Sequence, residues 1–221
     1  MLSLAYILLI CVGLPLLAWF SKKKLDAGLV VPRMPLYAEA LFLQTLLLLI
    51  SYGVASVARV RLFRAPQVDA TAILAGAGVL ALALVSMTIG WRFAGPRSRQ
   101  RLAMLLPVNA QERAAWLAVS LAAGVSEEVA FRGMLPVLLT RQTRSAAVAI
   151  AISATAFALA HLLQGWSATA FVGIFGLIFH ALVWITGGLW TAIAVHVLYD
   201  AITGFTLGRI LARPRPEVAD A

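Results

Sequence analysis

Charged residues are scarce in this chain of 221 residues: Asp, Glu, Lys and Arg make up 12%, against about 25% in a typical soluble domain. Hydrophobic residues make up 62%, and the mean hydropathy is +0.93. This composition excludes an ordinary soluble domain. It predicts a polytopic membrane protein.

Cysteine and acidic residues are also few. Cys11 is the single cysteine, so an intrachain disulfide and a thiolate metal cluster are excluded. Nine acidic residues against 18 basic ones leave a formal net charge of +9. The basic residues concentrate between the apolar runs, so we expect membrane lipids, and no nucleic acid, as their partners.

Long apolar runs dominate the rest of the sequence. Each is about the 20 residues that cross the hydrocarbon of a bilayer as a helix. The runs cover about residues 2–20, 36–58, 70–91, 114–139, 145–164, 168–186 and 188–207. They predict an all-α fold, a polytopic transmembrane helix bundle of about seven spans. No basic residue precedes the first run and no clear cleavage site follows it, so we interpret it as a retained span and not as a signal peptide.

The spaces between runs are too short for a separate soluble domain, so we expect one membrane domain with three parts. These are N-terminal membrane spans at 1–91, a helical core at 92–207 and a short C-terminal tail at 208–221, whose end from Arg213 is expected to be disordered. Between the third and fourth runs, basic residues alternate with apolar ones over Arg97–Pro107, which is typical of an interfacial helix. Asn109 followed by Glu112 resembles a helix cap, so the fourth span should begin near Ala110.

The distribution of Lys and Arg predicts the orientation. The richer set of loops contains Lys22–Arg33, Arg92–Arg113 and Arg209–Arg215, and the poorer set contains Arg59–Arg64, Arg141 and Arg144. The richer set should be cytoplasmic, which places the N-terminus outside and the C-terminus inside. A short, Ala-rich chain with far more Arg than Lys is typical of a bacterium, so we expect the bacterial inner membrane.

Three ionisable residues lie within the fourth run: Glu127, Glu128 and Arg132. Each costs roughly 2.5 to 3.5 kcal/mol to insert at the centre of a membrane helix, so such residues indicate a functional site. With 100° per residue, Glu128 and Arg132 share a helix face and form the pair, whereas Glu127 is expected to be unpaired. An unpaired carboxylate in a low-dielectric cavity suits a group that takes a proton from water and later returns it. Glu127 is therefore the candidate general base, although a buried ion network that only fixes helix packing is the alternative.

All three histidines also fall in apolar runs. His196 and Asp200 are one helical turn apart, a spacing that serves metal ligation or a hydrogen-bonded catalytic pair equally well. With Glu127 and His161 they provide the nitrogen and oxygen ligands of a divalent metal site, zinc for example, or hold a water molecule without metal. For His180 we favour an interhelical hydrogen bond. Phe157 lies one turn before His161, where it either walls the imidazole or packs in the core.

These residues form three ordered segments: Glu127–Gly133, Phe157–His161 and His196–Asp200. Together they resemble the motifs of the CPBP (Abi) intramembrane proteases, the group that includes the type II CAAX prenyl endopeptidases and bacteriocin-processing proteins. The resemblance covers about residues 92–207. It marks 92–207 as a CPBP-like catalytic core, while the first three spans match only as generic membrane helices.

The resemblance implies a membrane peptidase in which Glu127 and His161 activate a water molecule, with His196 and Asp200 near the scissile carbonyl. Glu128 and Arg132 match supporting or substrate-positioning residues. Members are commonly described as metalloproteases, and a metal-free glutamate mechanism is also argued for them. Asp200 stands where the family often has Asn; an Asp ligates metal well but stabilises an oxyanion only when protonated.

The function expected is therefore that of an intramembrane endopeptidase that cleaves near the C-terminus or leader of a membrane-associated peptide or lipidated protein. A proton- or cation-coupled carrier is an alternative, because buried Glu, His and Asp also build proton relays. The sequence has no repeated halves and no matching broken spans, which weighs against the carrier. A non-catalytic immunity or scaffold protein with the same fold is a third interpretation.

Overall fold

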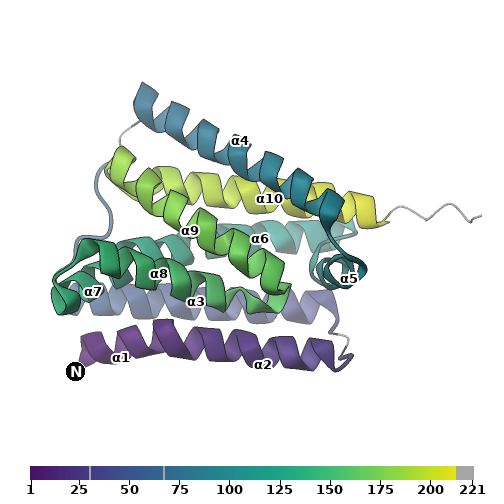
Figure 1. Cartoon of the computed structure of the whole chain (residues 1–221), viewed down its shortest axis with the longest axis horizontal. Helices are drawn as coiled ribbons and strands as arrows, with labels where there is room; N and C mark the ends of the chain where they lie inside the picture. Colours follow the sequence, from purple (N-terminus) through teal and green to yellow (C-terminus); the bar gives the residue numbers. More distant parts are fainter. Residues whose placement is uncertain (30, 67, 213–221) are drawn as a thin grey trace, which may run out of the picture.

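The computed structural model describes residues 1–29, 31–66 and 68–212. The predicted end of the tail, with Arg213 and Arg215, lies outside these residues. The described residues form helices and no strand (Figure 1). The elements are α1 (Leu2–Leu8), η1 (Leu9–Gly13), α2 (Leu14–Asp26), α3 (Arg33–Val57), α4 (Ala70–Phe93), α5 (Pro96–Leu105), α6 (Ala110–Glu127), η2 (Glu128–Met134), α7 (Leu135–Thr143), α8 (Ala146–Ala160), η3 (Leu162–Gln164), α9 (Trp166–Thr186) and α10 (Trp190–Ala212).

The predicted all-α bundle is confirmed, with one correction to its spans. Six continuous helices in the described part of the chain are long and apolar enough to cross a membrane: Leu2–Asp26, Arg33–Val57, Ala70–Phe93, Ala110–Thr143, Trp166–Thr186 and Trp190–Ile210. The chain is therefore an integral membrane protein. The run at 145–164 forms the shorter helix α8, because the α-helix ends at Ala160.

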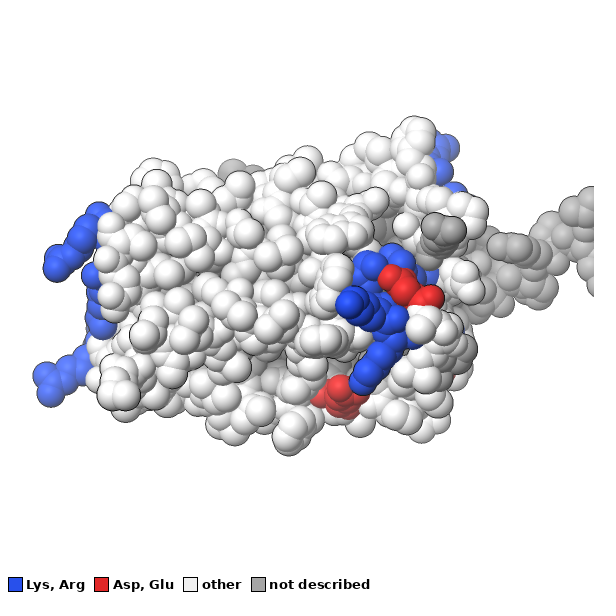
Figure 2. All heavy atoms as spheres, turned by 60° about the horizontal axis from the view of Figure 1, so that its bottom comes forward, with Lys and Arg blue, Asp and Glu red and all other residues white. Residues whose placement is uncertain are grey.

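The long helices lie side by side, with α1 and α2 at one edge of the bundle and α4 at the other (Figure 1). On the face shown in Figure 2, basic side chains gather at the two ends of the molecule and a wide uncharged band separates them. An uncharged band between two charged ends is what a bilayer requires of a protein that crosses it. The cytoplasmic assignment of one end stays a prediction from the charge count.

The short helix α8 places a histidine inside the bundle. Its 15 residues rise only about 22 Å, less than the roughly 30 Å of hydrocarbon. His161 follows directly as the C-cap residue, and a single 3-10 turn, η3, leads to Gly165. Gly165 has a φ of +98°, which L-residues with a side chain rarely adopt, and Arg101 Nη1 lies 2.6 Å from where a Cβ would stand. The chain therefore turns tightly beside His161.

The helix that carries the two glutamates begins as the sequence predicts. Asn109 caps α6 by accepting a hydrogen bond from the Glu112 amide at 2.9 Å. The Glu112 carboxylate in turn accepts one from the Val108 amide at 2.8 Å. The first bond satisfies an amide that the first helical turn leaves free, and the second holds the residue before the cap. The helix then continues through α6, η2 and α7 to Thr143, with a π-helical segment at Glu128–Met134.

A close contact joins α6 to α10. Trp116 donates a hydrogen bond from its indole Nε1 to the backbone carbonyl of Asp200, at 2.9 Å. Gly204 lies one turn further along α10, directly against the indole ring. Small residues allow membrane helices to approach closely, and here the approach fixes the backbone that carries Asp200.

The segment expected at the interface forms the helix α5. Figure 1 shows α5 nearly along its axis, so it lies crosswise to the long helices. Side chains from the first two spans hold it in place. Arg33 donates to the Ala103 carbonyl at 2.5 Å, Tyr37 donates to the Leu105 carbonyl at 2.8 Å, and Arg101 forms an ion pair with Asp26.

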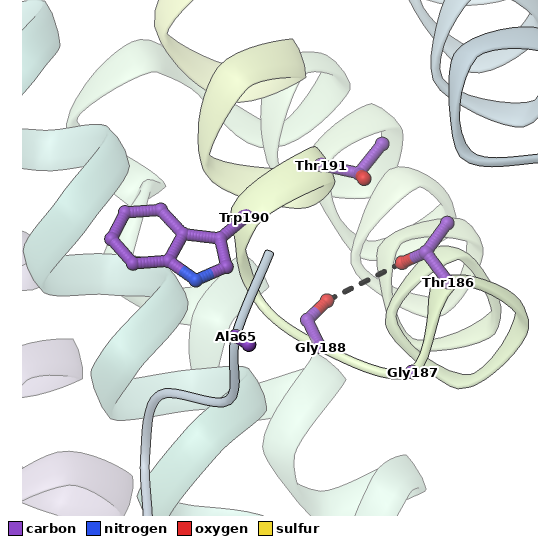
Figure 3. A pocket seen from close by; sticks show the side chains of 6 residues that line it. All are labelled: Ala65, Thr186, Gly187, Gly188, Trp190 and Thr191. Atoms are coloured by element: carbon purple, nitrogen blue, oxygen red, sulfur yellow. Dashed lines mark hydrogen bonds between the residues drawn. The ribbon is translucent and has the colours of Figure 1, made fainter. Parts of the chain in front are cut away.

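The turn between α9 and α10 carries a small pocket away from the histidines. Thr186 donates a hydrogen bond to the Gly188 carbonyl at 3.3 Å across this turn (Figure 3). Trp190 donates to the Arg64 carbonyl at 2.9 Å and so ties the turn to the loop before α4. The pocket has a volume of about 10 Å³, room for a single water molecule. We assign it a structural role.

Gly204 provides a test of the contact between α6 and α10. Gly204→Ala should lower the free energy of unfolding by about 1–3 kcal/mol, because the added methyl group overlaps the Trp116 ring. Gly78→Ala is the matched control, since a Cβ at Gly78 meets no atom within 4 Å. Thermal unfolding in detergent, followed by tryptophan fluorescence, measures both. Equal stability of the two variants would contradict the proposed close packing.

Candidate active site

Glu127 lies at the end of α6, where the α-helix passes into the π-helical segment. Its side chain is mostly buried. Oε1 accepts a hydrogen bond from Gln44 Nε2 at 2.6 Å. Oε2 receives none from the described residues, and it lies 3.8 Å from Nε2 of both His161 and His196. One carboxylate oxygen is therefore held by the protein, and the other faces two imidazoles.

His161 is oriented by its own helix. Its Nδ1 lies 2.8 Å from the Phe157 carbonyl oxygen. A carbonyl only accepts hydrogen bonds, so Nδ1 carries the hydrogen and donates. In the neutral ring Nε2 then presents its lone pair toward Glu127. The aromatic ring of Phe157 also lies against the imidazole, with ring centroids 4.6 Å apart.

His196 is oriented by a second carboxylate. Its Nδ1 donates to Glu128 Oε1 at 2.8 Å, a bond between α10 and the π-helical segment. Its Nε2 faces Glu127 and also lies 3.6 Å from Asp200 Oδ2, one turn further along α10. Three carboxylates thus surround one imidazole ring.

Behind these groups lies a fully buried ion pair. Arg132 Nη1 donates to Glu128 Oε1 at 3.1 Å, and the two side chains are 1% and 0% exposed. The guanidinium lies 3.9 Å from the centroid of the Phe157 ring and 5.4 Å from that of Phe179. An arginine over an aromatic face gains a favourable cation–π contact, so the aromatic rings compensate part of the cost of burying this charge.

The four residues predicted as catalytic, Glu127, His161, His196 and Asp200, therefore lie together. They come from the end of α6, the end of α8 and the middle of α10. The three predicted supporting residues, Glu128, Arg132 and Phe157, lie directly behind them. The ion pair of Glu128 with Arg132 has the predicted partners, and Phe157 both walls the imidazole and packs in the core.

Two details of the sequence analysis were wrong. The 100° periodicity does not apply to Glu128–Met134, because this segment is π-helical and its turns are wider. Glu127 is also not without a partner, since Gln44 bonds it from α3. Periodicity along one helix gives no information about a partner on another helix. The signal that was available is Gln44 itself, an uncharged polar residue within an apolar span.

His180 lies in α9 and is buried. Its Nε2 has no hydrogen-bond partner among the described residues, so this nitrogen does not make the interhelical hydrogen bond expected of His180. His180 takes no part in the group of Glu127, His161 and His196.

A cavity of about 640 Å³ opens on the candidate site. Glu127, His161 and Gln44 form part of its wall, and Lys24 and Glu39 are its other charged residues. The rest of the wall is mostly apolar and comes largely from η1, α2, α3 and α5, including Leu14, Leu17, Leu36, Leu43, Leu47 and Met104. The first two spans, which the sequence analysis described only as generic helices, thus supply most of the cavity wall.

The same His, Asp and Glu side chains were predicted to bind a metal ion. In the described part of the chain, no three or more His, Cys, Asp or Glu side chains are grouped so that they could hold one. The facing donor atoms are 3.6–3.8 Å apart, wider than the about 3.4 Å between ligands of tetrahedral zinc. As placed, these side chains do not fit zinc. Metal binding stays a prediction of the sequence, and we derive no step through it.

One part of the chain is similar to a known protein family. Residues 109–202 match the family model described as type II CAAX prenyl endopeptidase Rce1-like. The resemblance to intramembrane proteases of the CAAX type is thereby confirmed. The match covers less than half of the chain, contains all four predicted catalytic residues, and supports a protease activity. No curated protein and no solved structure matches the chain.

The buried ion pair gives a test of the site's framework. Arg132→Met should lower the free energy of unfolding by about 3–5 kcal/mol, because it leaves the Glu128 carboxylate buried without its cation. Glu128→Met combined with Arg132→Met should recover part of this loss, since no charge then stays uncompensated. Denaturant unfolding in detergent measures the three proteins.

Arg141→Met is the matched control. Arg141 is exposed and donates to the Ala58 carbonyl, so its loss should cost about 1 kcal/mol or less. A similar loss of stability in Arg132→Met and Arg141→Met would show that the buried ion pair of Glu128 and Arg132 does not stabilise the site.

Proposed function

We propose that this protein is an intramembrane endopeptidase in which Glu127 is the general base. The observation that carries the proposal concerns Glu127 Oε2, which accepts no hydrogen bond from the described residues and faces two imidazole nitrogens, while Glu127 lines a cavity. Glu127 Oε2 and the neutral His161 Nε2 are both acceptors. A water molecule that donates one hydrogen to each would join these atoms at ordinary hydrogen-bond distances of about 2.8 Å.

The reaction then follows from the positions of these groups. The water loses a proton to Glu127 as its oxygen attacks the carbonyl carbon of the peptide bond. His196, as an imidazolium with carboxylates on several sides, donates from Nε2 to the developing oxyanion. Glu127 returns the proton to the leaving amine, and the carbon–nitrogen bond breaks. Asp200 acts through His196, whose charged form its carboxylate stabilises.

The cavity supports a substrate with a long apolar group. Its wall is mostly apolar and its volume is within the range that small-molecule ligands occupy. We propose a membrane-associated protein or peptide that is cleaved near its C-terminus or leader and that carries a lipid chain or an apolar tail. The Rce1-like match favours this substrate class and does not favour the carrier.

Lipid partners and location follow the sequence predictions. The charged ends on either side of the uncharged band suit contact with lipid headgroups. We propose the inner membrane of a bacterium, with the C-terminus in the cytoplasm.

Glu127→Gln tests the general base directly. The variant should cleave at least 10³-fold more slowly than the wild type, because an amide does not accept the proton of water. The measurement is release of the C-terminal fragment from a library of lipidated peptides by the protein in liposomes. Asp69→Asn is the matched control, since Asp69 caps α4 and Asn caps equally well. Unchanged cleavage by Glu127→Gln would show that Glu127 is not the general base. A wild-type protein that cleaves no peptide would favour the interpretation as a non-catalytic scaffold.

Removal of metal ions tests whether the proposed reaction proceeds without a metal ion. Cleavage should keep more than half of its rate after treatment with a chelator, because no step requires a metal ion. Metal content of the same sample is measured in parallel. Loss of cleavage that added zinc restores would show instead that the donor atoms close around a metal.

A further inference from the structure

Gln44 connects the N-terminal spans to the candidate base. Its Nε2 donates to Glu127 Oε1 at 2.6 Å, and its Oε1 accepts a hydrogen bond from the Ser126 hydroxyl. A carboxylate only accepts hydrogen bonds, so the amide group of Gln44 must turn its nitrogen toward Glu127. Ser126 is fully buried and fixes the opposite end of the same amide. The orientation of Gln44 is thus determined on both sides.

This contact distinguishes the two oxygens of Glu127. The terminal torsion of a glutamate has only broad preferences, so the side chain alone does not hold one oxygen toward a substrate. The bond from Gln44 occupies Oε1, and Oε2 is left facing His161 and His196. Gln44 also lines the cavity beside Glu127, at the point where a substrate would reach the base.

We propose that Gln44 is a positioning residue of the reaction and that it selects Glu127 Oε2 as the proton acceptor. Gln44 lies in α3, outside the segment that matches the family model. The first spans therefore complete the site and do more than anchor it. This inference rests on the proposed function, because it concerns the base of that same reaction.

The experiment compares Gln44→Leu with the wild type in the liposome cleavage assay. We expect kcat to fall roughly 10- to 100-fold with KM changed less than threefold. Thr45→Val is the matched control: it is the next residue on α3, and its hydroxyl bonds the Leu41 carbonyl of its own helix. Its kcat and KM should equal those of the wild type.

Ser126→Ala provides a second, milder test that keeps Gln44 in place. It should lower kcat by a few fold in the same direction, because the amide loses one of its two constraints. The double variant should be no slower than Gln44→Leu alone, since both changes act on one chain of hydrogen bonds. Additive losses would indicate independent packing defects and overturn the proposal.

Other outcomes are also decisive. An unchanged kcat in Gln44→Leu would remove Gln44 from the mechanism, and a rise in KM alone would assign it to the cavity wall only. If Gln44→Leu unfolds at a lower temperature than Thr45→Val, the kcat of Ser126→Ala decides, and an unchanged kcat there overturns the proposal. A wild type without cleavage would overturn the proposed function itself.

Discussion

The site depends on one buried carboxylate, Glu128, which accepts hydrogen bonds from both Arg132 and His196. Its side chain has no contact with solvent, so its charge must be compensated by the protein. Arg132 provides the compensation, and the rings of Phe157 and Phe179 cover the guanidinium. With its charge satisfied in this way, Glu128 holds the imidazole of His196 at one angle, and the Nε2 atom of that ring faces the candidate base.

Two carboxylates that are neighbours in the sequence therefore have different tasks. Glu128 faces the interior and organises the framework, while Glu127 faces the cavity and has one oxygen without a protein donor in the described residues. The π-helical segment that starts between them changes the rotation of the chain there. Such segments often occur at functional sites, and here both carboxylates lie beside the imidazole of His196 on α10.

Much of this could be predicted from local patterns. The cap at Asn109 and Glu112, the pairing of Glu128 with Arg132, and the shared face of His196 and Asp200 all depend on residues at most four positions apart. The start of α6 at Ala110 follows from the same short-range chemistry. The end of α8 was placed too late, because residues 161–164 continue the apolar run but leave the α-helix for a 3-10 turn.

The sequence by itself determined that the chain is a bundle of membrane helices and which ionisable residues are its candidate chemistry, because composition and helical periodicity are properties of single segments. Only the tertiary structure decided that Gln44 bonds Glu127, that η1, α2 and α3 line the cavity, and that Nε2 of both His161 and His196 faces the base. The contact between Gln44 and Glu127 joins residues 83 positions apart. No periodic pattern within one helix specifies a contact with another, so such contacts are fixed only when the helices pack.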